Sequence, residues 1–272
     1  MAAIKGRLLI IAGSDSGGGA GIQADIKTAC AMGVYAATAI TAVTVQDTQR
    51  VYDVHGVPPE TIVAQIKAVL GDIGADAIKV GMIGSAAAAD AVAGCLQDYR
   101  SSPAAQGVPI VIDPVLVATS GDALAQDETA GVLKEKLIPL ASLLTPNLAE
   151  LAALTDMPTE SREDILSAAG KLIDAGAEAV LAKGGHGGGD RVDDYLVTDD
   201  RVTTFDHPRQ KTSNTHGTGC TLAAAAASGL AAGLPLQDAV GQAITYVQKA
   251  MAAAPGFGKG HGPLNHLVDP HK

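Results

Sequence analysis

The 272-residue sequence contains no tryptophan, and aromatic residues make up only 3% of it. Proteins that bind single-stranded nucleic acid stack the bases on aromatic side chains, so this class of function is disfavoured. Basic residues are also few, because 19 Lys and Arg stand against 29 Asp and Glu, for a net charge of −10. No cluster of Lys and Arg offers the electrostatic footprint of a nucleic-acid-binding protein. We therefore predict no nucleic-acid partner.

Cysteines and long apolar runs are scarce as well. The three cysteines, Cys30, Cys95 and Cys220, lie far apart and form no C-x-x-C pair, which predicts neither a zinc site nor a disulfide framework. We find no apolar segment of membrane length and no signal-peptide core. These absences predict a cytoplasmic protein that does not associate with membranes.

What the sequence does contain is a regular alternation of short β-branched runs with longer segments rich in Ala and Leu. Repeated strand–helix–strand units predict an α/β fold with a mostly parallel sheet and helices on both faces. No lasting shift of composition marks a linker, so we predict a single domain over residues 1–272. The predicted strands are 8–12, 36–45, 77–80, 108–112, 142–144 and 179–183, with a hairpin of 195–197 and 201–205. The predicted helices are 21–32, 58–70, 86–96, 124–137, 161–175, 218–232 and 236–253.

The segment at residues 214–221 reads N-T-H-G-T-G-C-T and leads into an alanine-rich run. Gly217 and Gly219 allow several backbone N–H groups to converge on one point. The first turn of the following helix adds unpaired N–H groups and a partial positive charge, which predicts an anion site, most often for phosphate. Cys220 would lie beside the anion, where a helix N-terminus should lower the pKa of its thiol. The alternative is a loop-to-helix junction with a buried, inert cysteine.

Other nucleotide-binding signatures are weak. Residues 19–24 formally match G-x-G-x-x-A, but the first glycine lies well beyond the predicted strand instead of at its end. No Walker sequence occurs. A nicotinamide-dependent dehydrogenase is therefore disfavoured.

Seven motifs in a fixed order carry a resemblance to a known family. They are A-G-S-D-S-G-G-G-A-G-I-Q-A-D-I-K-T at 12–28, V-x-x-Q-D-T at 43–48, K-V-G-M-I at 79–83, D-P-V at 113–115, L-T-P-N-L-A-E at 144–150, K-G-G-H at 183–186, and N-T-H-G-T-G-C-T. From about residue 8 to about residue 266, the chain resembles the hydroxymethylpyrimidine/phosphomethylpyrimidine kinases of thiamin synthesis, a branch of the ribokinase superfamily. The resemblance implies a ribokinase-like three-layer αβα sandwich with a reduced lid. It also implies Mg²⁺ as cofactor, ATP as co-substrate and a homodimer.

The implied activity is phosphorylation of 4-amino-5-hydroxymethyl-2-methylpyrimidine, and then of its monophosphate to the diphosphate. Phosphoryl transfer depends mainly on positioning and on neutralising charge. The backbone amides of Gly217, Thr218 and Gly219 would cradle the transferred group. Most of the superfamily has an aspartate base where this chain has Cys220, which would either remove the hydroxyl proton or only orient the hydroxyl.

The resemblance also implies residues that bind the pyrimidine. The amide of Gln46 offers the donor and acceptor that a ring nitrogen beside an exocyclic amine requires. Asp25 would make a second polar contact, with a first-turn helix charge as the alternative. Gly13 would bring the backbone close to the substrate, and Met82 and Val115 would pack against the ring.

Later motifs supply the residues implied for ATP and metal. Mg²⁺ prefers oxygen ligands and keeps several waters, so one or two carboxylates near the phosphates suffice. Surface charge is the alternative role for Lys183 and Glu150, and loop shaping is the alternative for His216. The implied ATP-binding residues are Lys183, Asn147, Thr215 and His216, and the implied metal ligands are Asp113 and Glu150.

The first loop departs from the family pattern. Relatives often have proline or threonine where this chain has Asp15-Ser16-Gly17, and Gly17 begins a triple glycine, which predicts looser closure over the pyrimidine. Two other functions stay open. One is pyridoxal kinase, because some relatives with the same cysteine-containing loop accept pyridoxal. The other is a non-catalytic nucleotide-binding module.

Overall fold

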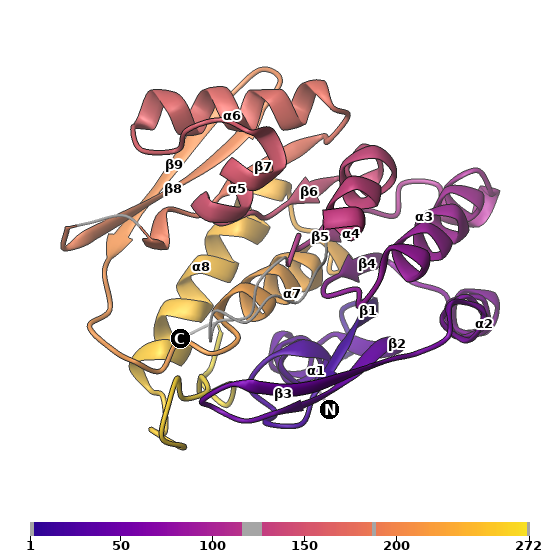
Figure 1. The fold of residues 1–272 in the computed structure, drawn as a ribbon, viewed down its shortest axis with the longest axis horizontal. Helices are drawn as coiled ribbons and strands as arrows, with labels where there is room; N and C mark the ends of the chain where they lie inside the picture. Colours follow the sequence, from indigo (N-terminus) through magenta and orange to yellow (C-terminus); the bar gives the residue numbers. More distant parts are fainter. Residues whose placement is uncertain (1–2, 116–126, 187–188, 271–272) are drawn as a thin grey trace.

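The computed structural model describes residues 3–115, 127–186 and 189–270 (Figure 1). The strands of this part of the chain form one sheet in the order β3-β2-β1-β4-β5-β6-β7-β8-β9. Strands β2, β1, β4, β5, β6 and β7 are parallel, whereas β3, β8 and β9 extend the two edges with antiparallel pairing. The strands are β1 Arg7–Asp15, β2 Tyr35–Gln46, β3 Val51–Gly56, β4 Ala77–Val80, β5 Ile110–Ile112, β6 Leu143–Leu144, β7 Ala179–Ala182, β8 Arg191–Thr198 and β9 Val202–Pro208.

Helices follow most of the parallel strands, as expected for a sheet built from crossover connections. They are α1 Gly21–Met32, α2 Pro59–Asp72, α3 Ala86–Arg100, α4 Asp127–Val132, α5 Leu148–Thr155, α6 Arg162–Asp174, α7 Thr218–Ala231 and α8 Leu236–Ala252. A π-helical turn, Leu133–Leu137, continues directly from α4.

Alternating side chains of the central strands divide the apolar core into two layers. Leu9 and Ile11 of β1 pack with side chains of α2, α3, α5 and α6, whereas Leu8 and Ile10 pack with those of α1, α7 and α8. All four side chains are essentially inaccessible to solvent. Because both faces of the sheet are covered, the strands are apolar throughout, as the sequence indicated. The predicted three-layer αβα sandwich with a mostly parallel sheet is confirmed.

Most predicted elements are present with ends shifted by a few residues. The hairpin β8–β9 is longer than predicted, and the capping box of α6 is formed by Ser161 and Asp164. Strand β3 and helix α5 were not predicted. Every residue of β3 after Val51 is exposed, so its pattern lacks buried alternation. The first residues of the helix predicted at 124–137 lie outside the described part of the chain.

Residues 256–266 form a C-terminal strap across one side of the molecule. The His261 N–H donates to the carbonyl of Thr48 at 2.7 Å, and the Thr48 hydroxyl accepts from the N–H groups of Lys259 and Gly260. The strap also reaches the loop before α7, where the Thr215 hydroxyl lies 3.2 Å from Nδ1 of His261. It therefore connects the end of β2 to the start of α7.

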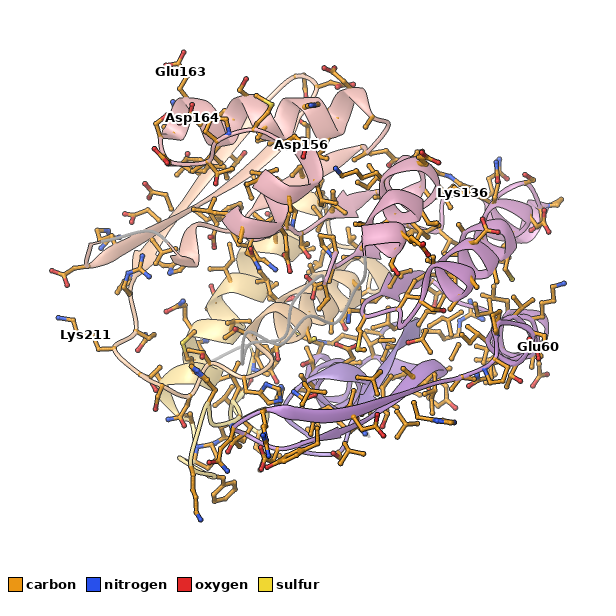
Figure 2. The ribbon with its side chains drawn as sticks, in the orientation of Figure 1. Glu60, Lys136, Asp156, Glu163, Asp164 and Lys211 are labelled. Carbon is orange, nitrogen blue, oxygen red and sulfur yellow. The ribbon has the colours of Figure 1, made fainter. Side chains whose placement is uncertain are left out.

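The charged side chains labelled in Figure 2 lie on the outside of the molecule. Figure 2 shows Glu60 and Glu163 pointing away from the sheet on helices α2 and α6. Within the part of the chain that the structure describes, no helix has the length and apolar character needed to cross a membrane.

Candidate active site

A cleft of about 700 Å³ lies at the carboxyl ends of the parallel strands, the usual position of a ligand site in an open α/β sheet. Its walls come from the ends of β1, β2, β4 and β5, the starts of α5 and α7, and the turn after β7. The cleft brings together every predicted site residue except Asp25. These are Gly13, Gln46, Met82, Asp113, Val115, Asn147, Glu150, Lys183, Thr215, His216, Gly217, Thr218, Gly219 and Cys220.

The loop before α7 has the backbone geometry of an anion site. Gly217 is the N-cap of α7 with φ +83°, and a Cβ at this position would lie 1.8 Å from the carbonyl oxygen of Gly19. Glycine is therefore required both by the left-handed conformation and by the close approach of the two loops. Within the described residues, no side chain caps α7. The Thr218 N–H donates to the Thr215 carbonyl at 3.3 Å, so the N–H groups of Gly219 and Cys220 are the first-turn donors that an anion would meet. The Thr218 hydroxyl donates to the carbonyl of Thr215 at 2.8 Å, which tightens the turn.

A buried carboxylate and a lysine face this loop from the sheet. Lys183 Nζ lies 3.2 Å from Oδ1 of Asp113, which also accepts a hydrogen bond from Thr145. A Cβ on Gly219 would lie 3.4 Å from Lys183 Nζ and 3.5 Å from Asp113 Oδ2. Burial alone would lower the pKa of Lys183, but Asp113 and Glu150 outweigh it and raise this pKa. Both charged groups thus lie beside the first turn of α7, where a phosphate would bind.

Asn147 and Glu150 form a capping box at the start of α5. Asn147 Oδ1 accepts from the Glu150 N–H at 2.9 Å, and Glu150 Oε2 accepts from the Asn147 N–H at 2.8 Å. Glu150 is buried, so it is not the solvated surface charge considered as its alternative. Among the described residues, no group of three or more His, Cys, Asp or Glu side chains is arranged to hold a metal ion.

Asp25 does not line the cleft, in contrast to its predicted contact with the substrate. Its side chain is completely buried, and its Oδ2 accepts from Lys79 Nζ at 2.8 Å. Lys79, which is equally buried, lines the cleft instead. Burial raises the pKa of Asp25 to about 6 against the opposing effect of Lys79. Burial also acts to lower the pKa of Lys79, but Asp25, Cys220 and Asp113 outweigh it and keep Lys79 charged.

A buried charge could have been noticed in the sequence. Lys79 occupies the third position of the strand A-I-K-V, whose other members are apolar. A lysine in a fully buried strand requires a partner, because an isolated buried ammonium is very costly. The pattern therefore indicated a buried ion pair, although it did not indicate which carboxylate would form it.

The predicted lowering of the Cys220 thiol pKa is wrong. Burial raises the pKa of Cys220 to about 12, with Lys79 and the Gly21 N–H acting in the opposite direction. Desolvation of a thiolate outweighs the effect of the helix N-terminus on this pKa, although the Cys220 residue is half-buried and lines the cleft. In the ligand-free protein, Cys220 is therefore a neutral thiol at physiological pH.

We expect Cys220 to react with iodoacetamide at pH 7.5 at least about tenfold more slowly than Cys30, because the thiolate is the reactive form and Cys30 is exposed. Peptide mass spectrometry during a labelling time course would measure both rates in the same sample. A Cys30→Ser variant provides the control for assignment. Equal labelling rates for Cys30 and Cys220 would contradict a neutral Cys220 thiol with a raised pKa.

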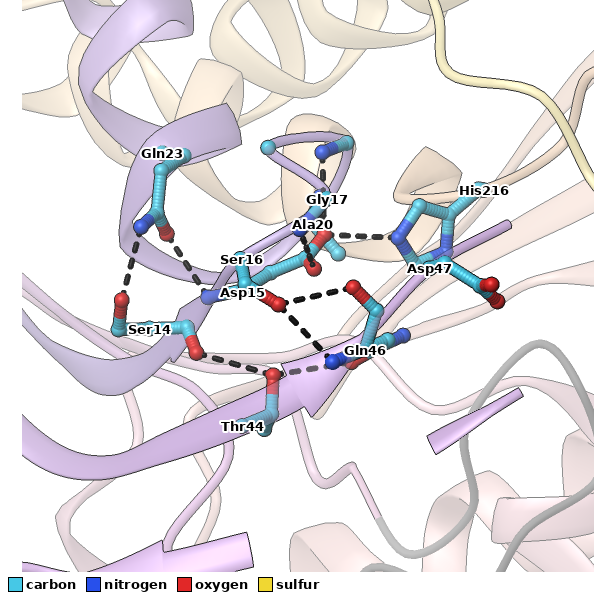
Figure 3. A network of polar contacts seen from close by, with 12 residues as sticks. Ser14, Asp15, Ser16, Gly17, Ala20, Gln23, Thr44, Gln46, Asp47 and His216 are labelled. Atoms are coloured by element: carbon cyan, nitrogen blue, oxygen red, sulfur yellow. Dashed lines mark hydrogen bonds and ion pairs between the residues drawn. The ribbon is translucent and has the colours of Figure 1, made fainter. Parts of the chain in front are cut away.

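The first glycine-rich loop is held by hydrogen bonds to Asp15, whereas the looser closure over the pyrimidine predicted from Asp15-Ser16-Gly17 stays a prediction. The buried carboxylate of Asp15 accepts hydrogen bonds from the N–H groups of Gly17, Gly19 and Ala20. His216 Nε2 lies 2.8 Å from Oδ2 of the same carboxylate (Figure 3). Burial acts to raise the pKa of Asp15, but these hydrogen bonds outweigh it and lower the pKa. His216 thus performs the loop-shaping role considered as its alternative.

The residues predicted for the pyrimidine that line the cleft lie at or just after the ends of β1, β2, β4 and β5. The Oε1 atom of Gln46 lies 3.3 Å from the Thr44 hydroxyl, and the Gln46 side chain is half-buried. A Cβ on Gly13 would lie 3.0 Å from the sulfur of Met82, so only glycine permits this contact without displacement. Val115 also lines the cleft.

Sequence reasoning missed several residues of the cleft beyond β7. Arg209 donates from Nε to the Gly189 carbonyl at 2.8 Å and from Nη1 to the Gly185 carbonyl at 2.6 Å. Its Nη2 is buried without a hydrogen-bond partner among the described residues. Asp194 accepts from the Gly184 N–H at 2.8 Å and orders the same turn. The sequence signal that could have identified this side of the site is Arg209, which directly follows strand β9.

Comparisons with known proteins agree with this arrangement. A sequence model described as phosphomethylpyrimidine kinase matches residues 15–265. A hydroxymethylpyrimidine/phosphomethylpyrimidine kinase from Rhizobium meliloti is 45% identical over 95% of this chain and 96% of its own length. The thiamine biosynthesis bifunctional protein ThiED from Geobacter sulfurreducens is 44% identical over 97% of this chain, which spans only 53% of that longer protein. Among solved structures, the pyridoxal kinase from Staphylococcus aureus superposes with a TM-score of 0.87 at 31% identity, covering 97% of this chain and 94% of that one, in complexes with pyridoxal and with AMP-PCP.

Proposed function

Because the chain belongs to the phosphomethylpyrimidine kinase family, we propose that it phosphorylates 4-amino-5-hydroxymethyl-2-methylpyrimidine with ATP and then phosphorylates the monophosphate to the diphosphate. The proposal rests on the observation that Gln46 and the Gly217–Cys220 loop line the same cleft. A pyrimidine held at Gln46 would direct its hydroxymethyl group toward the helix N-terminus. ADP would leave toward Lys183 and Arg209.

In the first step, the hydroxymethyl oxygen attacks the γ-phosphorus of ATP and its hydroxyl proton passes to Cys220 in the thiolate form or to solvent, while the new oxygen–phosphorus bond forms and the bond to ADP breaks. Negative charge then spreads over the transferred group, where the amides of Gly217, Thr218 and Gly219 stabilise it. Lys183 would neutralise phosphate charge beside Asp113. Asn147 and Thr215 would contact ATP from the two loops that border the cleft.

The residues present fit a magnesium ion. Asp113 and Glu150 both line the cleft and are buried, and Mg²⁺ needs only one or two carboxylates when phosphate oxygens and waters complete its shell. We assign these two residues as its ligands. The ion would supply charge neutralisation for the phosphates.

Pyridoxal kinase is the second candidate. The Staphylococcus aureus enzyme solved with pyridoxal has the same fold over nearly the whole chain, and pyridoxal carries a hydroxymethyl group on a similar ring. Gln46 and Met82 favour the pyrimidine. A non-catalytic nucleotide-binding module is disfavoured because the anion loop, Asp113 and Lys183 are all in place.

A direct assay tests the proposal. Purified protein is incubated with Mg²⁺-ATP and, separately, with hydroxymethylpyrimidine, its monophosphate and pyridoxal, while ADP release is measured. We expect both pyrimidines to be turned over. Far better turnover of pyridoxal than of either pyrimidine would make the protein a pyridoxal kinase, and ATP binding without turnover of any acceptor would favour the non-catalytic alternative.

Replacing Gln46 by alanine should raise the KM for hydroxymethylpyrimidine by about 10- to 100-fold, because a bidentate hydrogen bond to the ring would be lost. The KM for ATP should stay within about twofold, since Gln46 lies at the end of β2 and away from Lys183. Steady-state kinetics with each substrate varied in turn would measure both constants. An unchanged KM for the pyrimidine would remove Gln46 from the binding site.

Assembly, location and domain organisation stay predictions. A homodimer is supported by exposed apolar side chains on β2 and β3, among them Tyr35, Val45 and Tyr52. These two strands lie at one edge of the sheet (Figure 1). Cytoplasmic location is supported by three free cysteines, and a single domain over 1–272 by the one continuous sheet. Light scattering of the purified protein should give twice the mass of the 27.2 kDa chain.

A further inference from the structure

The Asp15 carboxylate joins the two loops of the cleft that would have to act together. Its Oδ2 accepts from the N–H groups of Gly19 and Ala20, at 3.0 and 2.8 Å, and lies 2.8 Å from His216 Nε2. Its Oδ1 accepts from the Gly17 N–H at 2.8 Å. One buried side chain therefore fixes the loop after β1 and, through His216, the loop before α7.

The backbones of these two loops are also in direct contact. A Cβ on Gly217 would overlap the carbonyl oxygen of Gly19, and a Cβ on Gly19 would lie 2.4 Å from Cδ2 of His216. Neither loop can move toward the other, and the Asp15–His216 contact prevents them from moving apart. His216 directly precedes Gly217, the N-cap of the helix that forms the anion site.

The same network continues to the residue predicted to recognise the pyrimidine. The Asp15 N–H donates to Gln23 Oε1 at 2.9 Å, and Gln23 Nε2 donates to the Ser14 hydroxyl at 2.8 Å. The Thr44 hydroxyl lies within hydrogen-bond distance of both the Ser14 carbonyl and Gln46 Oε1. Ser16 donates from its hydroxyl to the Gln46 carbonyl and accepts from the Gln46 N–H. Figure 3 shows these contacts as one continuous set from Gln46 to His216.

We propose that Asp15, acting through His216, is a positioning residue that holds the acceptor-binding end of the cleft and the phosphoryl-binding loop at a fixed separation. This inference rests on the proposed kinase function. Phosphoryl transfer depends on the alignment of the attacking oxygen with the γ-phosphorus, and small displacements are costly. Asp15 itself need not touch either substrate.

An Asp15→Asn variant tests the proposal because an amide has only one acceptor oxygen. Both oxygens of Asp15 face N–H donors, so an amide nitrogen in either position meets another donor. We expect kcat to fall by about 10- to 100-fold with both hydroxymethylpyrimidine and its monophosphate, as for a misaligned site. The KM for the pyrimidine should rise as well, whereas Gln46→Ala should change mainly this KM.

The matched control is Asp47→Asn. Asp47 lies beside Gln46 and also accepts loop hydrogen bonds, from the N–H groups of Gln49 and Arg50 and from the Tyr52 hydroxyl. The Asp47→Asn substitution therefore removes a loop carboxylate but leaves the contact between the loop after β1 and the loop before α7 unchanged. We expect kcat for Asp47→Asn within about twofold of wild type, since an exposed loop substitution has small effects.

His216 variants separate positioning from general destabilisation. We expect His216→Ala to lower kcat as Asp15→Asn does, and His216→Gln, whose amide can donate to Asp15, to recover part of the loss. The Asp15→Asn/His216→Ala double variant should be no slower than the slower single variant, because residues acting as one unit are not additive. Each variant is assayed well below its unfolding midpoint.

Multiplicative losses in the double variant, or a normal kcat in folded Asp15→Asn, would overturn the proposal. Failure of the wild-type protein to phosphorylate any of the three acceptors would instead refute the kinase function. If Asp15→Asn does not fold, the comparison of His216→Gln with His216→Ala decides the question, and equal kcat for these two would count against positioning.

Discussion

Replacement of Cys220 by alanine should slow phosphorylation of hydroxymethylpyrimidine by about 100-fold or more, the range for loss of a group that handles a proton in the transition state. Phosphorylation of the monophosphate should slow by less than about tenfold, because a phosphate acceptor has no essential proton to remove. Single-turnover measurements with each acceptor would give both rates. Equal losses with the two acceptors would count against a base role for Cys220.

The pH dependence of the first step distinguishes removal of the proton from orientation of the hydroxyl. With the pKa of Cys220 at about 12, the thiolate fraction rises about tenfold for each pH unit between 7 and 9. If the thiolate is the base, the first rate rises with pH over this interval, and this rise is absent from Cys220→Ala. If the thiol only orients the hydroxyl, the first rate has the same pH dependence in the wild-type protein and in Cys220→Ala over this interval.

Replacement of Lys79 by methionine should lower the free energy of unfolding by about 3–5 kcal/mol at pH 8, because one buried charge is left without its partner. Asp25 is completely buried, and its Oδ1 has no hydrogen-bond partner among the described residues, so Lys79 is its principal support. Urea unfolding followed by circular dichroism would measure the change.

The free energy of unfolding that Lys79→Met loses should be smaller at pH 5 than at pH 8. Without Lys79, the pKa of Asp25 rises further above 6, while in the unfolded chain it stays near 3.8. A carboxyl whose pKa is higher in the folded state binds its proton preferentially there, so the folded variant gains stability as pH falls. The control is Asp25→Leu/Lys79→Met, which should recover most of the stability because it removes both charges. Equal stability of Lys79→Met and wild type at pH 8 would contradict the buried ion pair.

The grouping of the candidate site could be predicted because it depends on topology. Gly13, Gln46, Asp113 and Lys183 all lie at or just after the carboxyl ends of strands, and parallel strands place these ends along one edge of the sheet. Motif order then indicated which side chains would meet, although they are as many as 170 residues apart, from 13 to 183. These predictions needed no knowledge of side-chain packing.

Features that depend on tertiary packing could not be predicted. Lys79 and Asp25 are 54 positions apart, and the packing of α1 on the sheet beside β1 brings them together. The pKa of Cys220 followed burial rather than the helix N-terminus, and local sequence does not reveal the burial of one side chain. The triple glycine looked flexible because its restraint comes from Asp15 and from His216, a residue 201 positions away.

The C-terminal strap has a consequence for the order in which the protein becomes active during synthesis. Thr48, near the pyrimidine-binding end, and Thr215, beside the anion loop, are both fastened by residues from 257 onward. Synthesis proceeds from the N-terminus at about 5–20 residues per second, and earlier parts of a chain fold first. The sheet and its two helical layers can therefore assemble on the ribosome while both ends of the cleft still lack these contacts. We therefore expect the cleft to reach its final form only when the strap has been made, after the helices and strands that the structure describes.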